Sequence, residues 1–285
     1  MLLLPEWAVW AFKQNIISMK NEVRKRASFF LRLEFNRVIT KFFLVLDKKR
    51  KKFLLMSIRF YFYRFFMDKV YVVLFGRPGS GKGFLGDCIK QEIVRQNVLS
   101  ASQMVYLSTG DLLRTEIALG SPLGLKIKEI VNSGGLVSDE IVNELFAKAC
   151  RCDATLVFVD GYPRTREQYD VFIASVKAEG GVVIPINRDT PPKLILERAK
   201  ERRVCKNCKA THSVKDGCCP KCGGESLVRA DDAVIDKRIA EFERNTAGLW
   251  FEFCMDSDFA ETVDGTIEAK YIAKQFVRDY AVLFQ

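Results

Sequence analysis

Continuous runs of β-branched and aromatic residues mark the expected strands of this chain. Three runs, 70–75, 155–159 and 182–186, have almost no polar positions. Such runs are typical of strands buried on both faces, as in a parallel sheet covered by helices. Helical periodicity fills the segments near 83–96, 122–132, 139–151, 165–179, 191–203, 232–245 and 267–281. This alternation predicts an α/β fold built on a parallel sheet.

Residues 1–66 follow a different pattern. Apolar residues recur at helical spacing over 31–45, and a basic run occupies 48–52. Together they predict a basic amphipathic helix. Three interpretations stay open: translated upstream sequence with the protein starting at Met67, an organelle-targeting segment, or a helix that binds a membrane surface or a partner. No uncharged apolar run reaches the ~18–20 residues that a membrane span needs.

Charge divides the chain at the same place. The 285 residues contain 45 Lys and Arg against 35 Asp and Glu, a net charge of +10. The segment 1–66 alone carries +11, and 67–285 carries −1. The larger segment therefore gives no electrostatic reason to expect nucleic-acid binding. The apolar opening residues 1–4 lack a basic lead-in and a small-residue cleavage site, so we do not expect secretion. In a chain that is not secreted, nine Cys residues favour metal binding or free thiols over disulfides.

A glycine-rich turn, Gly76–Gly83, follows the first strand and precedes a helix. Glycines let the backbone wrap around phosphate oxygens, and the N–H groups and the helix N-terminus supply positive potential. Lys82 adds a positive charge suited to β- and γ-phosphates. Gly83 occupies the position where the general motif has a Ser or Thr that binds Mg²⁺.

Two Cys-x2-Cys pairs lie ten residues apart in the second half of the chain. This spacing can place four thiolates tetrahedrally around Zn²⁺, in a structural site with no open position. Cys218 could replace its neighbour, although the spacing favours Cys219. Free thiols, disulfides and an iron–sulfur site remain alternatives. His212, the single histidine, is expected to be a loop or nucleotide-edge residue. The proposed ligands are Cys205, Cys208, Cys219 and Cys222.

Several short segments combine turn residues with charge: 108–114, 160–165, 198–203, 229–232 and 237–238. The segment 160–165 follows a buried strand, and open α/β sheets bind ligands at the carboxyl ends of their strands. Beside a phosphate loop, the arginines suit a polyanionic ligand, because guanidinium groups bind phosphoryl oxygens and stabilise transferring charge.

These motifs, in this order, resemble the adenylate kinase family in its bacterial-type form with a zinc-bearing lid. The resemblance covers about Met67 to the C-terminus and includes 135–140 besides the segments above. It implies a P-loop nucleoside monophosphate kinase fold with five parallel strands, helices on both faces and a zinc-ribbon-like lid. The implied insertions are a monophosphate-binding segment, 108–137, and a lid, 202–229. The implied reaction is phosphoryl transfer from Mg-ATP to AMP, giving two ADP.

The resemblance also implies roles for individual residues. For ATP these are Gly76, Pro78, Gly79, Ser80, Gly81, Lys82, Gly83, Phe84, Arg198 and Arg202. For AMP they are Thr109, Arg114, Val137, Gly161, Arg164 and Gln168. The implied catalytic set is Lys82, Arg114, Arg164, Arg202, Arg229, Arg238 and Asp160. Asp160, and more loosely Asp111, would hold the water shell of Mg²⁺.

The sequence departs from the family pattern at several places. Phe84 stands where the family has Thr, so one hydrogen bond to phosphate is lost and the ring is expected to crowd the site. Gly135 replaces a Lys, the lid is short, and the interval from Arg229 to Arg238 is about two residues shorter than usual. We expect reduced rather than abolished activity.

Two other functions stay open: a kinase for another nucleoside monophosphate, or a catalytically weak nucleotide-binding or zinc-ribbon interaction protein. Thr109 favours AMP as the acceptor over other nucleoside monophosphates. The resemblance favours a cytoplasmic monomer whose partners are nucleotides, with no nucleic acid. Organelle targeting or membrane contact would depend on residues 1–66.

Overall fold

The computed structural model describes residues 69–132, 137–208, 211–228 and 235–284. The chain divides into two units, Met1–Phe66 and Met67–Gln285, and all the described residues belong to the second. The expected helix over 31–45 lies outside the described residues. In the described part of the chain, no helix is long and apolar enough to cross a membrane.

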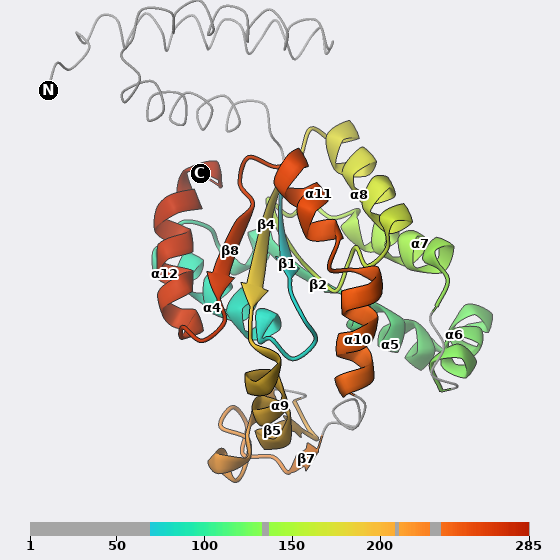
Figure 1. Cartoon of the computed structure of the whole chain (residues 1–285), viewed down its shortest axis with the longest axis vertical. Helices are drawn as coiled ribbons and strands as arrows, with labels where there is room; N and C mark the ends of the chain where they lie inside the picture. Colours follow the sequence, from blue (N-terminus) through green and yellow to red (C-terminus); the bar gives the residue numbers. More distant parts are fainter. Residues whose placement is uncertain (1–68, 133–136, 209–210, 229–234, 285) are drawn as a thin grey trace, which may run out of the picture. The chain divides into compact units, whose positions relative to one another are not determined.

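A five-stranded parallel sheet forms the centre of the second unit (Figure 1). Its order is β2-β3-β1-β4-β8, with the strands at Val70–Phe75 (β1), Met104–Ser108 (β2), Leu156–Asp160 (β3), Val182–Asp189 (β4) and Glu261–Asp264 (β8). The predicted α/β fold with five parallel strands is confirmed. The edge strand β8 was not predicted, because Val263 is its only buried residue.

The helices lie between and after these strands. Their bounds are Lys82–Arg95 (α4), Thr109–Leu119 (α5), Pro122–Asn132 (α6), Asp139–Cys150 (α7), Arg166–Ala178 (α8), Pro192–Glu201 (α9), Ile235–Asn245 (α10), Leu249–Asp256 (α11) and Ala269–Tyr280 (α12). Short 3-10 helices occupy Ala101–Gln103, Val214–Asp216 and Ala281–Leu283. The predicted helix 191–203 was wrong at its last two residues, since α9 ends at Glu201 and a strand begins at Arg202.

Two helix layers cover the sheet. Helices α4 and α12 pack together on one face, while α7, α8 and α11 contribute to the core on the other (Figure 1). Strand β1 serves both layers, because alternate side chains of a strand point to opposite faces. Tyr71, Val73 and Phe75 join the core beside α8 and α11, while Leu74 lies toward Gly86 of α4. All six residues of β1 are buried.

The segment after α9 forms a small antiparallel sheet of its own, in the order β6-β5-β7. Its strands are Arg202–Cys205 (β5), Thr211–Ser213 (β6) and Ser226–Val228 (β7). We call this segment, 202–228, the lid. Strand β5 continues directly from α9, so the lid joins the main fold at the carboxyl end of that helix.

Candidate functional site

The glycine-rich turn between β1 and α4 has the backbone of a phosphate-binding loop. Gly76 and Gly79 have φ of 132° and 81°, in the region that favours glycine. A Cβ at Gly76 would lie 2.7 Å from the Arg188 carbonyl oxygen, and one at Gly79 would lie 2.7 Å from Ile195 Cγ2. Neither position can hold a larger residue without movement, so the close-packed loop explains why the motif requires glycine here.

Side chains from β4, α9 and α10 hold this loop in place. The Ser80 carbonyl accepts hydrogen bonds from Thr190 Oγ1 at 3.1 Å and from Arg198 Nη1 at 3.5 Å. Arg77 donates to Asp189 Oδ1 at 2.8 Å and to Glu243 Oε1 at 2.6 Å. The structure therefore places Arg198, an expected ATP residue, directly beside the phosphate loop.

Lys82 lies at the start of α4 and faces the carboxyl end of β3. Its Nζ is 4.0 Å from Asp160 Oδ1 and donates to the Arg77 carbonyl at 3.3 Å. Burial lowers the pKa of Lys82; the Asp160 charge opposes this shift, and three nearby arginines add to it. These arginines are Arg164, Arg238 and Arg202. The fold therefore gathers one lysine and three expected catalytic arginines from α4, β5, α10 and the loop after β3.

Asp160 is shared between Lys82 and a residue that the sequence analysis missed. Tyr106 of β2 donates its hydroxyl to Asp160 Oδ2 at 3.0 Å. Burial and the Asp160 charge raise the pKa of Tyr106 well above its usual range, so the phenol stays protonated. Gly83 lies close to both groups, since a Cβ there would be 3.4 Å from Asp160 Oδ2 and from the Tyr106 hydroxyl.

The residues expected to bind AMP form a second connected group. Gly161 is its centre: its carbonyl accepts from Thr109 Oγ1 and from Arg164 Nε, each at 2.8 Å. Gln168 Oε1 accepts from the Arg164 backbone N–H at 2.8 Å. Asp139, which sequence analysis did not assign to the site, accepts from Gln168 Nε2 at 2.7 Å and so fixes that amide.

Other expected site residues lie apart from these contacts or outside the described residues. Arg114 is exposed on α5 and pairs with Asp111 of the same helix. Val137 packs against the core. Arg229 and Gly135 lie outside the described residues. Phe84 is 67% exposed, so its ring projects toward solvent.

Four cysteines of the lid converge on one point. Their Sγ atoms all lie within 4.8 Å of one another, with Cys205 and Cys222 at 3.4 Å and Cys208 and Cys219 at 3.6 Å. Cys218 is exposed and is not a member of this cluster. The backbone N–H of Cys208 lowers the pKa of Cys205 to about 6. The pKa of Cys222 rises instead, because hydrogen bonds with Cys208 and Cys205 outweigh the one from the Gly224 backbone, so the thiolate that metal binding requires is favoured at Cys205.

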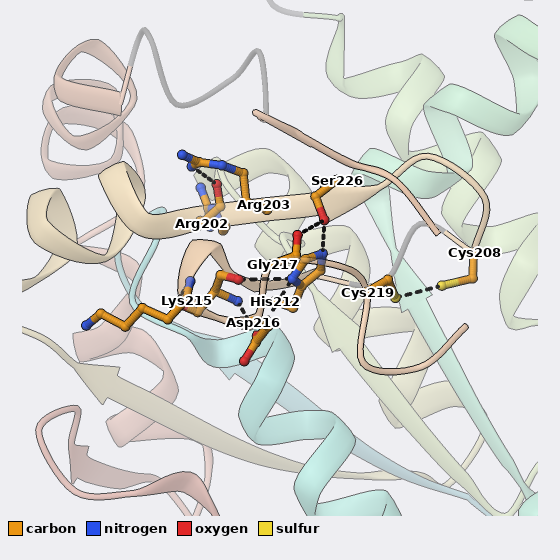
Figure 2. A network of polar contacts seen from close by, with 10 residues as sticks. Arg202, Arg203, Cys208, His212, Lys215, Asp216, Gly217, Cys219 and Ser226 are labelled. Atoms are coloured by element: carbon orange, nitrogen blue, oxygen red, sulfur yellow. Dashed lines mark hydrogen bonds and ion pairs between the residues drawn. The ribbon is translucent and has the colours of Figure 1, made fainter. Parts of the chain in front are cut away.

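The lid histidine is a structural residue rather than a cluster member (Figure 2). His212 Nδ1 lies 3.0 Å from the Ser213 carbonyl, and Nε2 lies 3.0 Å from Ser226 Oγ. Asp216 Oδ2 is 3.7 Å from Nδ1, and the imidazole is only 3% exposed. His212 therefore joins β6 to β7 and fills the interior of the lid, instead of standing at a nucleotide edge.

A parallel sheet with a phosphate loop after its central strand, and a lid inserted after α9, defines a P-loop nucleotide kinase. The adenylate kinase family model matches residues 74–257. The chain is 36% identical to an adenylate kinase of Symbiobacterium thermophilum over 210 residues, which span 69% of the chain and 91% of the relative. An adenylate kinase of Carboxydothermus hydrogenoformans is 33% identical, over 68% of the chain and 92% of the relative. An adenylate kinase of Thermococcus kodakarensis is 34% identical, over 61% of the chain and 78% of the relative. The chain belongs to the adenylate kinase family.

Proposed function

We propose that the protein transfers the terminal phosphoryl group of ATP to AMP, reversibly, giving two ADP. The observation that carries this proposal is the position of Lys82. It lies between the phosphate loop and Asp160, among Arg164, Arg202 and Arg238. Family membership and the names of the relatives support the same reaction.

The donor nucleotide would lie along the phosphate loop. Backbone N–H groups of Gly79–Gly83 and the Lys82 ammonium would bind its phosphates, as in other phosphate loops. Arg198 and Arg202 extend this side toward the lid. Asp160 fits a hard divalent cation, because its carboxylate oxygens are ligands of the type that Mg²⁺ prefers. Mg²⁺ bound with ATP would neutralise phosphate charge during transfer.

The acceptor nucleotide would lie on the other side of Lys82, near Gly161. Thr109 and Gln168 are proposed to orient AMP, with Val137 as an apolar wall. Arg114 and Arg164 would bind its phosphate. The network from Asp139 through Gln168 to the Arg164 backbone supports this role, since it fixes two groups at the same edge of the sheet.

The chemistry needs positioning and charge rather than a proton-transfer residue. The attacking phosphate oxygen of AMP is already ionised at neutral pH, so no general base is required. Lys82 and the arginines would stabilise the charge that spreads over the transferring phosphoryl oxygens. Closure of the lid over the loop would bring Arg202 to the phosphates and exclude water, which would otherwise hydrolyse ATP.

We also propose that the four lid cysteines hold one structural Zn²⁺. A tetrahedral site with bonds of about 2.3 Å places the sulfurs about 3.8 Å apart, close to the separations within the cluster. The four thiolates leave no position for water or substrate. Zinc would therefore stabilise the lid and take no part in the reaction.

The test is steady-state turnover of the full chain with Mg-ATP and each of AMP, GMP, CMP and UMP. We expect turnover selective for AMP. Lys82→Ala should lower kcat by about 10²–10³-fold, the effect typical of removing one group that stabilises transition-state charge. Lys177→Ala, an exposed residue of α8, is the matched control. Preference for another acceptor, or unchanged turnover in Lys82→Ala, would contradict the proposal.

A further inference from the structure

Arg188 is a buried cation that the site described so far does not use. It lies near the carboxyl end of β4 and is only 4% exposed. Its Nη2 donates to the carbonyls of Ile267 at 3.1 Å and Gly265 at 3.4 Å. Its Nε and Nη1 are buried and have no hydrogen-bond partner among the described residues. Two of its three nitrogens therefore remain unsatisfied.

No carboxylate in the described part of the chain forms an ion pair with Arg188. Burial lowers the pKa of Arg188, and the neighbouring charge of Arg198 adds to this shift. An arginine nevertheless stays protonated in proteins. A buried charge without a bonded counter-ion destabilises the folded state, and replacement by an apolar side chain often stabilises it. Folding stability alone therefore does not explain why a charged side chain occupies position 188.

The guanidinium lies directly against the phosphate loop. A Cβ at Gly81 would be 3.7 Å from Arg188 Nε and 4.0 Å from Arg198 Nη1. The two arginines also share one acceptor, because Arg198 Nη2 donates to the Gly265 carbonyl at 3.0 Å. Two cations therefore converge on the side of Gly81 to which a Cβ would point, next to Lys82 in the chain.

We propose that Arg188 is a positioning residue for the donor nucleotide, acting through the phosphate loop on the polyphosphate charge. A polyphosphate bound to the loop would supply the counter-charge that Arg188 lacks. The intervening buried backbone screens this attraction less than water would. The inference rests on the proposed function, because it takes the loop to bind the phosphates of ATP.

The test uses the full chain with Arg188→Met, which removes the charge but keeps an unbranched side chain. Arg188→Lys restores the charge, and Arg278→Met makes the same change at an exposed residue of α12. Calorimetry would measure the affinity for ATP, for inorganic tripolyphosphate and for AMP, each added alone. Thermal unfolding of the nucleotide-free protein would accompany each titration.

For Arg188→Met we expect affinity for ATP and tripolyphosphate to fall by about tenfold each, the scale of one partly screened charge. Affinity for AMP should be unchanged. KM for ATP should rise while KM for AMP stays constant, and Arg188→Lys should recover most of the loss. Without nucleotide, Arg188→Met should unfold at the same or a higher temperature than the natural chain.

Three results would overturn the inference. Unchanged affinity for tripolyphosphate would remove the role of charge, whether or not ATP binding changed. A parallel loss of AMP affinity and melting temperature would show a general structural role. Failure of Arg188→Lys to recover polyphosphate binding would likewise show that Arg188 has a structural role rather than a role through its charge. Absence of phosphoryl transfer by the natural chain would instead contradict the proposed function and leave these binding measurements intact.

Discussion

Phe84 combines an exposed ring with a position in the first turn of α4. A Thr at this place could donate a hydrogen bond to a phosphate, whereas the phenyl group cannot. We predict that Phe84→Thr raises kcat/KM for ATP by about 5- to 100-fold, the range expected for one hydrogen bond to a charged group. Steady-state kinetics with saturating AMP would measure it.

Phe84→Ala separates the missing donor from the bulk of the ring. If both variants gain equally, steric hindrance of the phosphate by the ring is responsible. If neither gains, the lost hydrogen bond does not limit this enzyme. Only a gain confined to Phe84→Thr supports the expected cause of reduced activity.

At single residues, sequence patterns predict the motif members but not their partners. Lys82 and Asp160 were expected in the site because each belongs to a short motif with its own chemistry. Tyr106 and Arg188 were not, because a Tyr or an Arg in a strand carries no local signal of function. Their roles depend on which strands are neighbours: β2 lies beside β3, and the end of β4 lies beside the phosphate loop.

The carboxyl end of α4 contains a strongly perturbed carboxylate. Arg95 donates two hydrogen bonds to Glu92, at 2.8 and 2.6 Å, and Gln96 donates a third at 2.6 Å. The Arg95 hydrogen bonds are the main cause that lowers the pKa of Glu92 from 4.5 to about 2. The ionised form is thus favoured by folding, and α4 gains a stabilising contact at neutral pH.

The stability that this contact contributes is fully present above the pKa of Glu92 in the unfolded chain, and it is lost as pH falls from about 4.5 toward 2. We predict that Glu92→Gln lowers the free energy of unfolding by about 1–2 kcal/mol at pH 7, since Arg95 is largely exposed and the interaction is screened. The difference from the natural chain should shrink as pH approaches 2. Urea unfolding at several pH values measures this, and a difference independent of pH would contradict it.

The lid depends on its cysteine cluster because its three strands have only three or four residues each. We predict that Cys219→Ser loses the zinc and lowers Tm by about 5 °C or more, since metal binding is coupled to folding. Cys218→Ser changes the adjacent residue outside the cluster and should retain one zinc per chain. Metal analysis and thermal unfolding test both variants, and equal behaviour would refute the assigned ligands.

Elements with strong periodicity were predicted well, and short ones were not. The sequence analysis found α4, α7 and α8 within a residue or two, because each has a regular apolar face. It missed α5, whose first residues were interpreted as a loop. In the structure Ser108 caps α5 by accepting from the Asp111 N–H, and Gly120 ends it at φ 65°. It also missed α11, which has only eight residues.

For the whole molecule, the residues of the site belong to the second unit, Met67–Gln285. We predict that a chain starting at Met67 keeps kcat within about twofold of the full chain, because a unit with its own core folds alone. Parallel kinetics of the two proteins measure this. A large loss in the shorter chain would give residues 1–66 a part in catalysis or folding, beyond the interpretations open from sequence.

The arrangement of layers followed from the sequence, while the assembly of the site did not. Buried runs such as 70–75 require helices on both faces, so the fold class follows from simple burial. The cluster around Lys82 combines groups from residues 82 to 238, and its distances depend on how α9, the lid and α10 return to the sheet. Such packing is set by the whole chain and leaves no local pattern.

The position of His212 has a practical consequence for spectroscopy. The chain contains one histidine, and its imidazole is enclosed within the lid. The aromatic imidazole protons in an NMR spectrum would therefore come from a single residue and report on the lid alone. Removal of metal, or closure over a nucleotide, could be followed through these signals in unlabelled protein, separately from the methyl signals of the core.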